Sequence, residues 1–189
     1  LKGTPFIYQG QEIGMTNAYF ESIDKYRDVE SLNYYDILTK EKPQNEVLGV
    51  LQKKSRDNSR TPMQWDSSKN AGFSTGTPWL GVCKKYKDIN AEKALEDKNS
   101  VFYHYKNLVA LRKEYGIIQN GSFEIVDMAN ESLYVYRRKY KNQELLVICN
   151  FYGKEITCDI DLEGYTLLNS NYSLTDKNIR PYEARVYIR

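Results

Sequence analysis

The chain has 189 residues, of which 41% are hydrophobic and 28% charged, and its formal net charge is +2. These proportions are typical of globular proteins. The small charge and the scattered lysines give no reason to expect a nucleic acid or an anionic membrane as a partner. No run of about 18 apolar residues occurs, so no membrane-spanning helix is expected. The three cysteines are widely spaced, which predicts neither a disulfide framework nor a metal site and favours a reducing, cytoplasmic location.

The first residues contain a β-prone run, Gly-Thr-Pro-Phe-Ile-Tyr at 3–8, which Gln9-Gly10 closes. This pattern predicts a short strand, and Pro5 is tolerated because it lies near the start of that strand. The chain lacks an initiator Met and begins inside an apolar segment. We therefore expect it to be a piece of a longer protein.

Two helical stretches are expected next. Residues 22–35 place apolar and aromatic side chains at helix-like spacing, and residues 36–54 continue the pattern with an interruption at Pro43. Proline ends or interrupts a helix because it lacks a backbone N–H and fixes φ. The second stretch carries an apolar stripe made of Val47, Leu48 and Leu51. Such a stripe is typical of core packing.

The segment 55–65 reads Ser-Arg-Asp-Asn-Ser-Arg-Thr-Pro-Met-Gln-Trp, with Arg56 and Arg60 on either side of three small polar residues. Pro62 disfavours a helix at the residue before it, and Asp, Asn and Ser bond readily to nearby backbone, so a shaped loop is predicted. Two guanidinium groups on such a loop can bind carboxylates or sugar hydroxyls with defined geometry. From the residues alone, a surface turn with solvated arginines is the favoured interpretation.

Further along, the composition of residues 71–78 predicts a loop, and residues 90–95 predict a short helix. The strongest helix prediction is 100–115, with Ser100 suited to cap it and Gly116 suited to end it. Apolar and aromatic residues recur along it at helical spacing: Val101, Tyr105, Leu108, Leu111 and Tyr115.

After Gly116 the pattern changes to short β-rich runs, at 121–127, 132–140, 143–151, 155–161 and 179–189. Lys141-Asn142 is predicted to turn between two of them. In the run 143–151 apolar residues occupy both alternating sets of positions, so both faces of that strand should be covered. Several short strands in sequence predict an antiparallel β-sandwich, in which Cys149 and Cys158 are small buried residues.

Three blocks of the chain together resemble one known family. Residues 55–65 resemble the Arg-Asp-Asn-x-Arg-Thr-Pro-Met-Gln-Trp motif of the α-amylase family of glycoside hydrolases. Residues 3–17 are similar to that family's last barrel strand and the loop after it, although Gln11 stands where an acidic residue is usual. Residues 26–33, Tyr-Arg-Asp-Val-Glu-Ser-Leu-Asn, also fit. The resemblance covers essentially the whole chain and is strongest to the branch that contains oligo-1,6-glucosidases and trehalose-6-phosphate hydrolases.

The resemblance implies an α+β fold in two parts. Residues 1–117 correspond to the end of a (β/α)8 TIM barrel, namely its last strand, the helices of the following loop and its last helix. Residues 118–189 correspond to an antiparallel β-sandwich at the C-terminus. The expected partners are the N-terminal part of the barrel and, through the exposed barrel edge, a second copy of the chain.

The resemblance also implies which functional residues of the family this chain contains and which it lacks. A retaining glycosidase needs two carboxyl groups about 5–5.5 Å apart, and the family carries them on motifs that have no counterpart in these residues. We therefore assign no catalytic residue, metal ligand or cofactor, and we expect the chain alone to hydrolyse no glucoside. By resemblance, Arg56 helps to hold the glucose of a small carbohydrate substrate. Arg60 is a second substrate-binding candidate, which could also pair with Asp57 or Glu12 and hold the loop.

Within the branch, several short segments look closer to trehalose-6-phosphate hydrolases, which produce glucose and glucose 6-phosphate. Oligo-1,6-glucosidases more often have Gly at position 55 and Ala at position 59, where this chain has Ser55 and Ser59. An oligo-1,6-glucosidase therefore remains an alternative, and so does a non-catalytic carbohydrate-binding or structural β-module. A row of exposed aromatic residues on the β-domain would favour the module. An exposed apolar surface on the N-terminal half would favour a region that docks on a partner.

Overall fold

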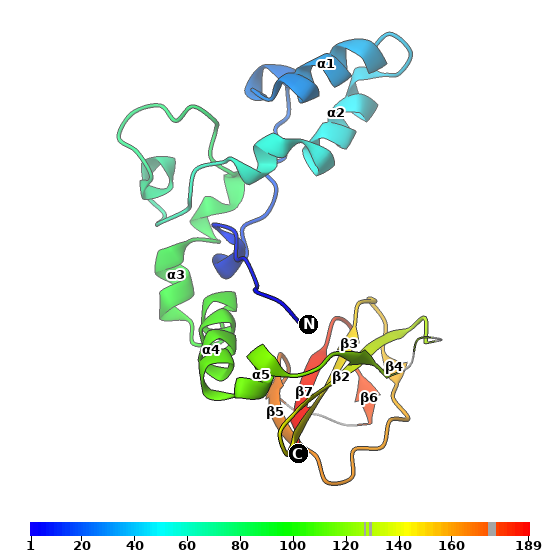
Figure 1. Ribbon diagram of the computed structural model, residues 1–189. Coiled ribbons are helices and arrows are strands. Elements are labelled where there is room, and N and C mark those ends of the chain that lie inside the picture. Colours follow the sequence, from blue (N-terminus) through cyan, green and yellow to red (C-terminus); the bar gives the residue numbers. More distant parts are fainter. Residues whose placement is uncertain (127, 129, 174–176) are drawn as a thin grey trace. The chain divides into compact units, whose positions relative to one another are not determined.

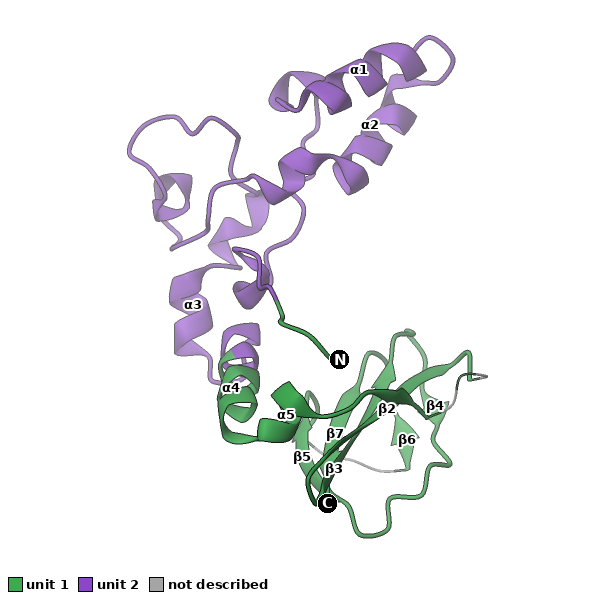
Figure 2. Ribbon diagram, in the orientation of Figure 1, with its two compact units in different colours: residues 1–5, 106–189 green, residues 6–105 purple. Residues whose placement is uncertain are grey.

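The computed structural model describes residues 1–126, 128, 130–173 and 177–189 (Figure 1). The chain divides into two compact units, one made of Phe6–Tyr105 and the other of Leu1–Pro5 together with Lys106–Arg189 (Figure 2). No helix among the described residues is long and apolar enough to cross a membrane.

The structure corrects the prediction of a strand at residues 3–8, because these residues form no strand. A strand exists only through hydrogen bonds to a neighbouring strand, and none of the described strands pairs with this segment. The apolar side chains that would face such neighbours are left in solvent, and Phe6 is 92% exposed. The chain then turns through the 3₁₀ helix η1, Gln11–Ile13.

The predicted helical stretches 22–35 and 36–54 correspond in part to two helices that lie side by side (Figure 1). The predicted bounds are wrong, because the first helix begins later than residue 22 and continues past residue 35. Helix α1 is Val29–Leu38 and helix α2 is Gln44–Lys54. Pro43 directly precedes α2, which confirms that this proline separates the helices. Two residues of the predicted stripe of α2 lie in a small core with residues of α1 and of the segments before α1 and after α2: Ala18, Phe20, Ile23, Tyr26, Tyr35, Leu48, Leu51, Leu80 and Cys83. The third stripe residue, Val47, is also buried.

Short helical turns make up much of the rest of this unit. They are η2 Ile23–Lys25, η3 Arg56–Ser59, η4 Lys69–Gly72, η5 Lys84–Lys87 and the α-helix α3 Ala91–Glu96. The side chain of Asn90 accepts a hydrogen bond from the backbone N–H of Lys93 and so caps α3, as expected for a helix that begins after Asn.

The strongest helix prediction is confirmed in its position by α4, Val101–Glu114. Gly116 does not end a helix, because it is the first residue of the next one, α5, Gly116–Asn120. Tyr115 adopts an extended conformation between them. The predicted apolar stripe of α4 is not a core within the described residues, since α4 buries none of its side chains.

The C-terminal part is built on a five-stranded antiparallel sheet in the order β1-β2-β3-β7-β5. Its strands are β1 Glu124–Ile125, β2 Leu133–Tyr140, β3 Gln143–Asn150, β5 Thr166–Ser170 and β7 Ala184–Ile188. A second sheet pairs β4 Ile156–Thr157 with β6 Asn178–Ile179. The predicted run 121–127 forms only the short β1, and its last residue, Asp127, lies outside the described residues.

Strand β3 is covered on both faces, as its sequence predicts. On one face Leu146 and Ile148 pack between the two sheets with Leu133, Val135, Cys158, Ile179 and Tyr187. On the other face Leu145 and Val147 pack against Ile117 of α5. The β2–β3 hairpin turns at Lys141, whose φ is 53°, and pairs Tyr140 with Gln143. The predicted antiparallel β-sandwich is therefore confirmed.

Candidate functional site

The segment that the sequence marks as a shaped loop forms the 3₁₀ helix η3 and the residues around it. We call residues 55–61 the arginine loop. The Ser55 hydroxyl accepts a hydrogen bond from the backbone N–H of Asp57 at 3.2 Å, which caps η3. The backbone N–H of Arg60 bonds to the carbonyl of Asp57 at 3.0 Å. The loop is thus a hydrogen-bonded turn, as the prediction of a shaped loop requires.

Both predicted substrate-binding residues meet at one carboxylate. Nη2 of Arg56 lies 3.0 Å from Oδ1 of Asp28 and 3.0 Å from Oε2 of Glu30. Nη1 of Arg60 lies 3.4 Å from the same Oδ1 of Asp28 and 3.7 Å from Oδ1 of Asp57. Arg60 therefore pairs with Asp57, one of its two expected partners, and with Asp28, which was not expected, while Glu12 is not its partner.

Asp28 is buried, with 5% of its side chain exposed, whereas the side chains of Arg56 and Arg60 are 57% and 39% exposed. Its Oδ2 accepts hydrogen bonds from the backbone N–H of Ser31 at 3.1 Å and from the Ser31 hydroxyl at 3.0 Å. These bonds cap the N-terminus of α1. One oxygen of the Asp28 carboxylate, Oδ2, thus caps the helix, and the other, Oδ1, pairs with the two arginines.

A buried polar network continues from this carboxylate into the arginine loop. The hydroxyls of Ser31 and Ser55 lie 2.7 Å apart. Oδ2 of Asp57, which is fully buried, accepts from the backbone N–H groups of Arg27 at 2.7 Å and Asp28 at 2.9 Å. Because buried polar groups are costly unless they are hydrogen-bonded, this network holds the start of α1 and the arginine loop together.

These surroundings shift the pKa values of two side chains, Asp28 and Tyr26. Burial opposes ionisation of Asp28, but the hydrogen bonds from Ser31 and the charge of Arg56 outweigh it, so the pKa of Asp28 lies below its ordinary value. Burial, together with the nearby charge of Asp57, raises the pKa of Tyr26 to about 12. At neutral pH the aspartate is therefore charged and the phenol is neutral.

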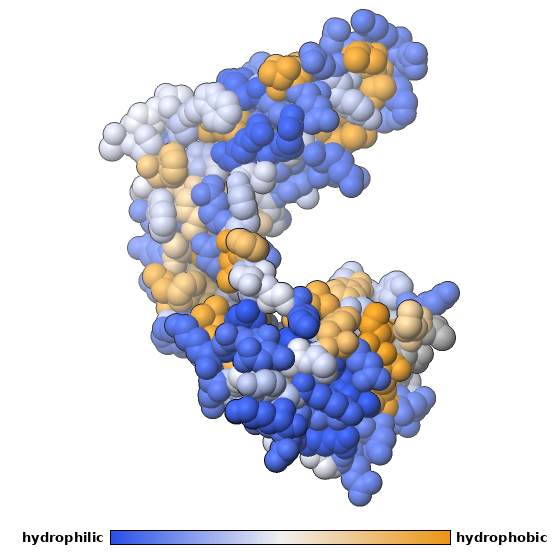
Figure 3. All heavy atoms as spheres, viewed as in Figure 1, coloured by the Kyte–Doolittle hydropathy of each residue, from blue (hydrophilic) through white to orange (hydrophobic). Residues whose placement is uncertain are grey.

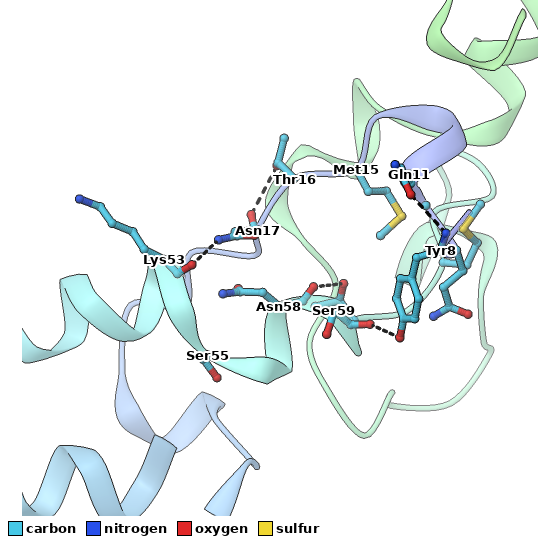
Figure 4. A pocket seen from close by; sticks show the side chains of 13 residues that line it. Tyr8, Gln11, Met15, Thr16, Asn17, Lys53, Ser55, Asn58 and Ser59 are labelled. Atoms are coloured by element: carbon cyan, nitrogen blue, oxygen red, sulfur yellow. Dashed lines mark hydrogen bonds between the residues drawn. The ribbon is translucent and has the colours of Figure 1, made fainter. Parts of the chain in front are cut away.

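A hollow of about 370 Å³ lies beside the arginine loop (Figure 4). Ser55, Asn58, Ser59 and Thr61 line it from the loop, and residues of the segment 8–17 line it from the other side. This volume is in the range of small-molecule sites. Neither Arg56 nor Arg60 is among its lining residues, so the structure places the two predicted residues on the loop but outside this hollow.

Hydrogen bonds join the two sides of the hollow (Figure 4). The Tyr8 hydroxyl donates to the carbonyl of Ser59 at 2.9 Å. Nδ2 of Asn17 donates to the carbonyl of Lys53 at 3.3 Å. The lining is thus made of hydroxyl, amide, thioether and phenol groups with one lysine, Lys53, and no Asp or Glu is among these lining residues.

Sequence reasoning missed Asp28 as the partner of both arginines. Its place before a helix was readable from the sequence, because Asp is a favoured residue at the position directly before a helix. No local pattern, however, could show that α1 begins next to the arginine loop. Among the described residues there is no group of three or more His, Cys, Asp or Glu side chains placed to hold a metal ion.

A model of the α-amylase catalytic domain matches residues 1–121. The chain belongs to the α-amylase family. It is 49% identical over 203 aligned positions to an oligo-1,6-glucosidase of Halalkalibacterium halodurans, an alignment that covers 100% of this chain and 36% of the relative. It is 47% identical to a trehalose-6-phosphate hydrolase of Bacillus subtilis, covering 99% of this chain and 35% of that protein.

Among solved structures, the chain is similar to a trehalose-6-phosphate hydrolase of Bacillus licheniformis. The TM-score is 0.93 at 50% sequence identity, and the match covers 99% of this chain and 36% of that one. The chain therefore spans about a third of the length of its relatives. Membership of the glycoside hydrolase family and the fold at the end of a TIM barrel with a β-sandwich are confirmed, whereas the two kinds of relative have nearly the same identity to the chain.

Proposed function

We propose that this chain is the C-terminal part of a retaining glycoside hydrolase that cleaves trehalose 6-phosphate to glucose and glucose 6-phosphate. The observation that carries the proposal is the arginine loop, whose motif is intact in a chain 47% identical to the trehalose-6-phosphate hydrolase of Bacillus subtilis and 50% identical to that of Bacillus licheniformis. The catalytic carboxyl groups would come from the rest of the barrel. The chain alone would then be inactive, because a glycosidase without its two carboxyl groups lacks both nucleophile and acid.

Within this proposal Arg56 binds the glucose and Arg60 supports the loop and adds to the binding. A guanidinium carries five N–H donors, and the ion pairs of Arg56 with Asp28 and Glu30 both use Nη2. Donors on the other nitrogens can therefore reach a sugar hydroxyl. Arg60 is less exposed and lies between two carboxylates, which suits the bracing role.

The proposed partner of residues 1–117 is the remaining part of the barrel, with residues 118–189 as the β-domain. Exposed apolar side chains in the unit Phe6–Tyr105 support this partner, and Figure 3 shows hydrophobic residues at the surface over α1 and α2. The apolar segment around Phe6 and the unburied helix α4 also support it. Without the barrel, the same surface would favour self-association. The free thiols of Cys83, Cys149 and Cys158 support a cytoplasmic location.

An oligo-1,6-glucosidase is the second candidate, supported by the 49% identity to the Halalkalibacterium halodurans enzyme. The presence of Ser55 in place of Gly is a weaker argument against an oligo-1,6-glucosidase than the sequence comparison suggests. The Ser55 hydroxyl bonds to Ser31 and caps η3, so its contacts explain a role in loop structure rather than in substrate choice.

A carbohydrate-binding β-module is a third candidate with one observation in its favour. Phe123, Tyr136, Tyr134 and Phe151 form a row on the sheet, with successive ring centroids 5.3, 5.8 and 6.3 Å apart. Stacking on a sugar needs open ring faces, however, and both tyrosines are only partly exposed. Phe151, at 69%, is the most exposed member of the row.

The experiment that tests the proposal measures kcat/KM of the full-length enzyme with trehalose 6-phosphate and with isomaltose. A clear preference for trehalose 6-phosphate is expected. A preference for isomaltose would assign the protein to the oligo-1,6-glucosidases, and hydrolysis of neither sugar would reject both proposed hydrolase activities. In parallel, the 189-residue chain is incubated with p-nitrophenyl α-glucoside, where reproducible turnover would contradict the absence of catalytic residues.

The β-module is tested by titrating the 189-residue chain with trehalose and isomaltose in a calorimeter. Binding that is lost in Phe151→Ala but kept in Arg56→Ala would favour the module. Absence of binding by the chain is expected if the sugar is held only between the arginine loop and the rest of the barrel.

A further inference from the structure

We propose that Asp28 is a positioning residue, which orients the guanidinium of Arg56 toward the substrate and shares its carboxylate with Arg60. The inference rests on the proposed function, because it assigns a role to the partner of a residue that binds sugar there. Asp28 itself is buried, and it acts through Arg56 rather than by touching the substrate.

The carboxylate of Asp28 is held in place before it meets either arginine. Two hydrogen bonds from Ser31 fix its Oδ2, and the N-terminus of α1 adds a favourable dipole for a negative charge. Its Oδ1 is left for the arginines and lies 3.0 Å from Nη2 of Arg56. A fixed anion on one side of a guanidinium limits the orientations that the long arginine side chain can adopt, so less order has to be imposed when a substrate binds.

Glu30 also touches Arg56 but is a weaker determinant of its position. Its Oε2 lies 3.0 Å from Nη2 of Arg56, yet its side chain is 71% exposed. Exposed ion pairs between flexible side chains contribute little, because water competes with them and salt screens them. The two carboxylates therefore offer an internal comparison at the same distance from the same nitrogen.

The backbone near Asp28 and the backbone near Arg56 are also linked by a hydrogen bond. Asp57, next to Arg56 in sequence, accepts from the backbone N–H of Asp28 at 2.9 Å. The positions of the loop and of the carboxylate are thus coupled through fully buried groups. Loss of the Asp28 charge should leave this backbone bond in place and remove only the pairing with the arginines.

The test uses Asp28→Asn in the full-length enzyme. Asn is as good a helix cap as Asp, so the melting temperature should change little, whereas a neutral amide cannot replace the charge that faces two arginines. We expect kcat/KM on the preferred sugar to fall by about 10–100-fold, the range for a misplaced binding group. Most of the loss should appear in kcat if Arg56 binds the transition state more tightly than the ground state.

Two further variants separate positioning from a general structural role. Glu30→Gln removes the exposed partner of Arg56 and should cost no more than about twofold in kcat/KM, as exposed pairs do. Asp28→Asn in an Arg56→Ala background should cause a much smaller further loss, because Arg56 is gone and only the pairing of Asp28 with Arg60 remains to be broken. A wild-type-like kcat/KM for Asp28→Asn, or equal losses with and without Arg56, would overturn the inference. If the wild-type enzyme hydrolyses neither sugar, the proposed function fails instead.

Discussion

The unit Phe6–Tyr105 and the five-stranded sheet differ in what holds them together. In the sheet, strands β2, β3 and β7 bury apolar side chains on both faces. In the other unit, the contacts that define the arginine loop are polar, through Asp28, Ser31, Ser55 and Asp57. Apolar side chains such as Phe6 remain in solvent there. The sheet is thus held mainly by apolar packing on both faces, whereas the other unit combines a small apolar core with buried polar contacts that fix the shape of the arginine loop.

Hydrogen exchange on the 189-residue chain should give the largest measurable difference between these regions. Backbone N–H groups of β3 bond on both sides to β2 and β7, so their exchange requires opening of the sheet. Phe6 and Ile7 lie in a segment without a pairing strand and should exchange about 1000-fold faster or more, if the sheet has the usual stability of a domain. Equal protection at low protein concentration would contradict the comparison, and protection that appears only at high concentration would indicate self-association.

Glu183→Gln should destabilise the β-domain strongly, because it breaks a buried ion pair. Oε1 of Glu183 lies 2.8 Å from Nε of Arg185, and both side chains are almost fully buried. Removing one charge leaves the other uncompensated, and we expect a loss of about 3–5 kcal/mol in the free energy of unfolding. Urea unfolding followed by circular dichroism measures it. The matched control is Asp159→Asn, which removes an exposed pair with Lys177 in the same domain; a loss of equal size there would argue against the role of burial.

Arg56→Ala in the full-length enzyme should affect activity rather than folding, in contrast to the preceding variant. A charge-assisted hydrogen bond to a sugar is worth roughly 1.5–3 kcal/mol, or about 10–150-fold in kcat/KM. Arg56→Lys should recover little, since a point charge cannot replace the planar guanidinium. Arg60→Ala should lower the melting temperature more clearly than the affinity. Wild-type kcat/KM for Arg56→Ala on both trehalose 6-phosphate and isomaltose would remove Arg56 from the site.

The smallest expected effect concerns pH and the buried carboxylate of the arginine loop. The pKa of Asp28 is lowered in the folded state, because the bonds from Ser31 and the charge of Arg56 outweigh burial. Its charge therefore contributes stability above the unfolded pKa of about 3.9, and this contribution is lost as the pH falls through the lower folded pKa. The difference in unfolding free energy between wild type and Asp28→Asn should be largest near neutral pH and shrink in acid. A difference that grows in acid would contradict this sign.

Several features of the fold were predictable because their causes are local. Pro43 separates two helices by its missing N–H, and Asn90 caps α3 with its own side chain. Apolar residues at both alternating sets of positions in β3 predicted a strand covered on two faces. Strand β5 was missed because its pairing with β7 shifts register between Leu167 and Asn169, which obscures the alternation that marks a strand.

The sequence by itself determined the family, the existence of the main helices, the β2–β3 hairpin and the shaped loop that carries Arg56 and Arg60, because motifs, periodicity and turns depend on neighbouring residues. The helix boundaries were less well determined, since α1 begins at Val29 and not at residue 22. Only the tertiary structure decided that residues 3–8 form no strand, since a strand depends on hydrogen bonds to partners elsewhere in a chain. It also decided that Asp28 meets both arginines. That contact depends on where α1 begins relative to η3, and packing and buried hydrogen bonds determine this placement, not any spacing in the sequence.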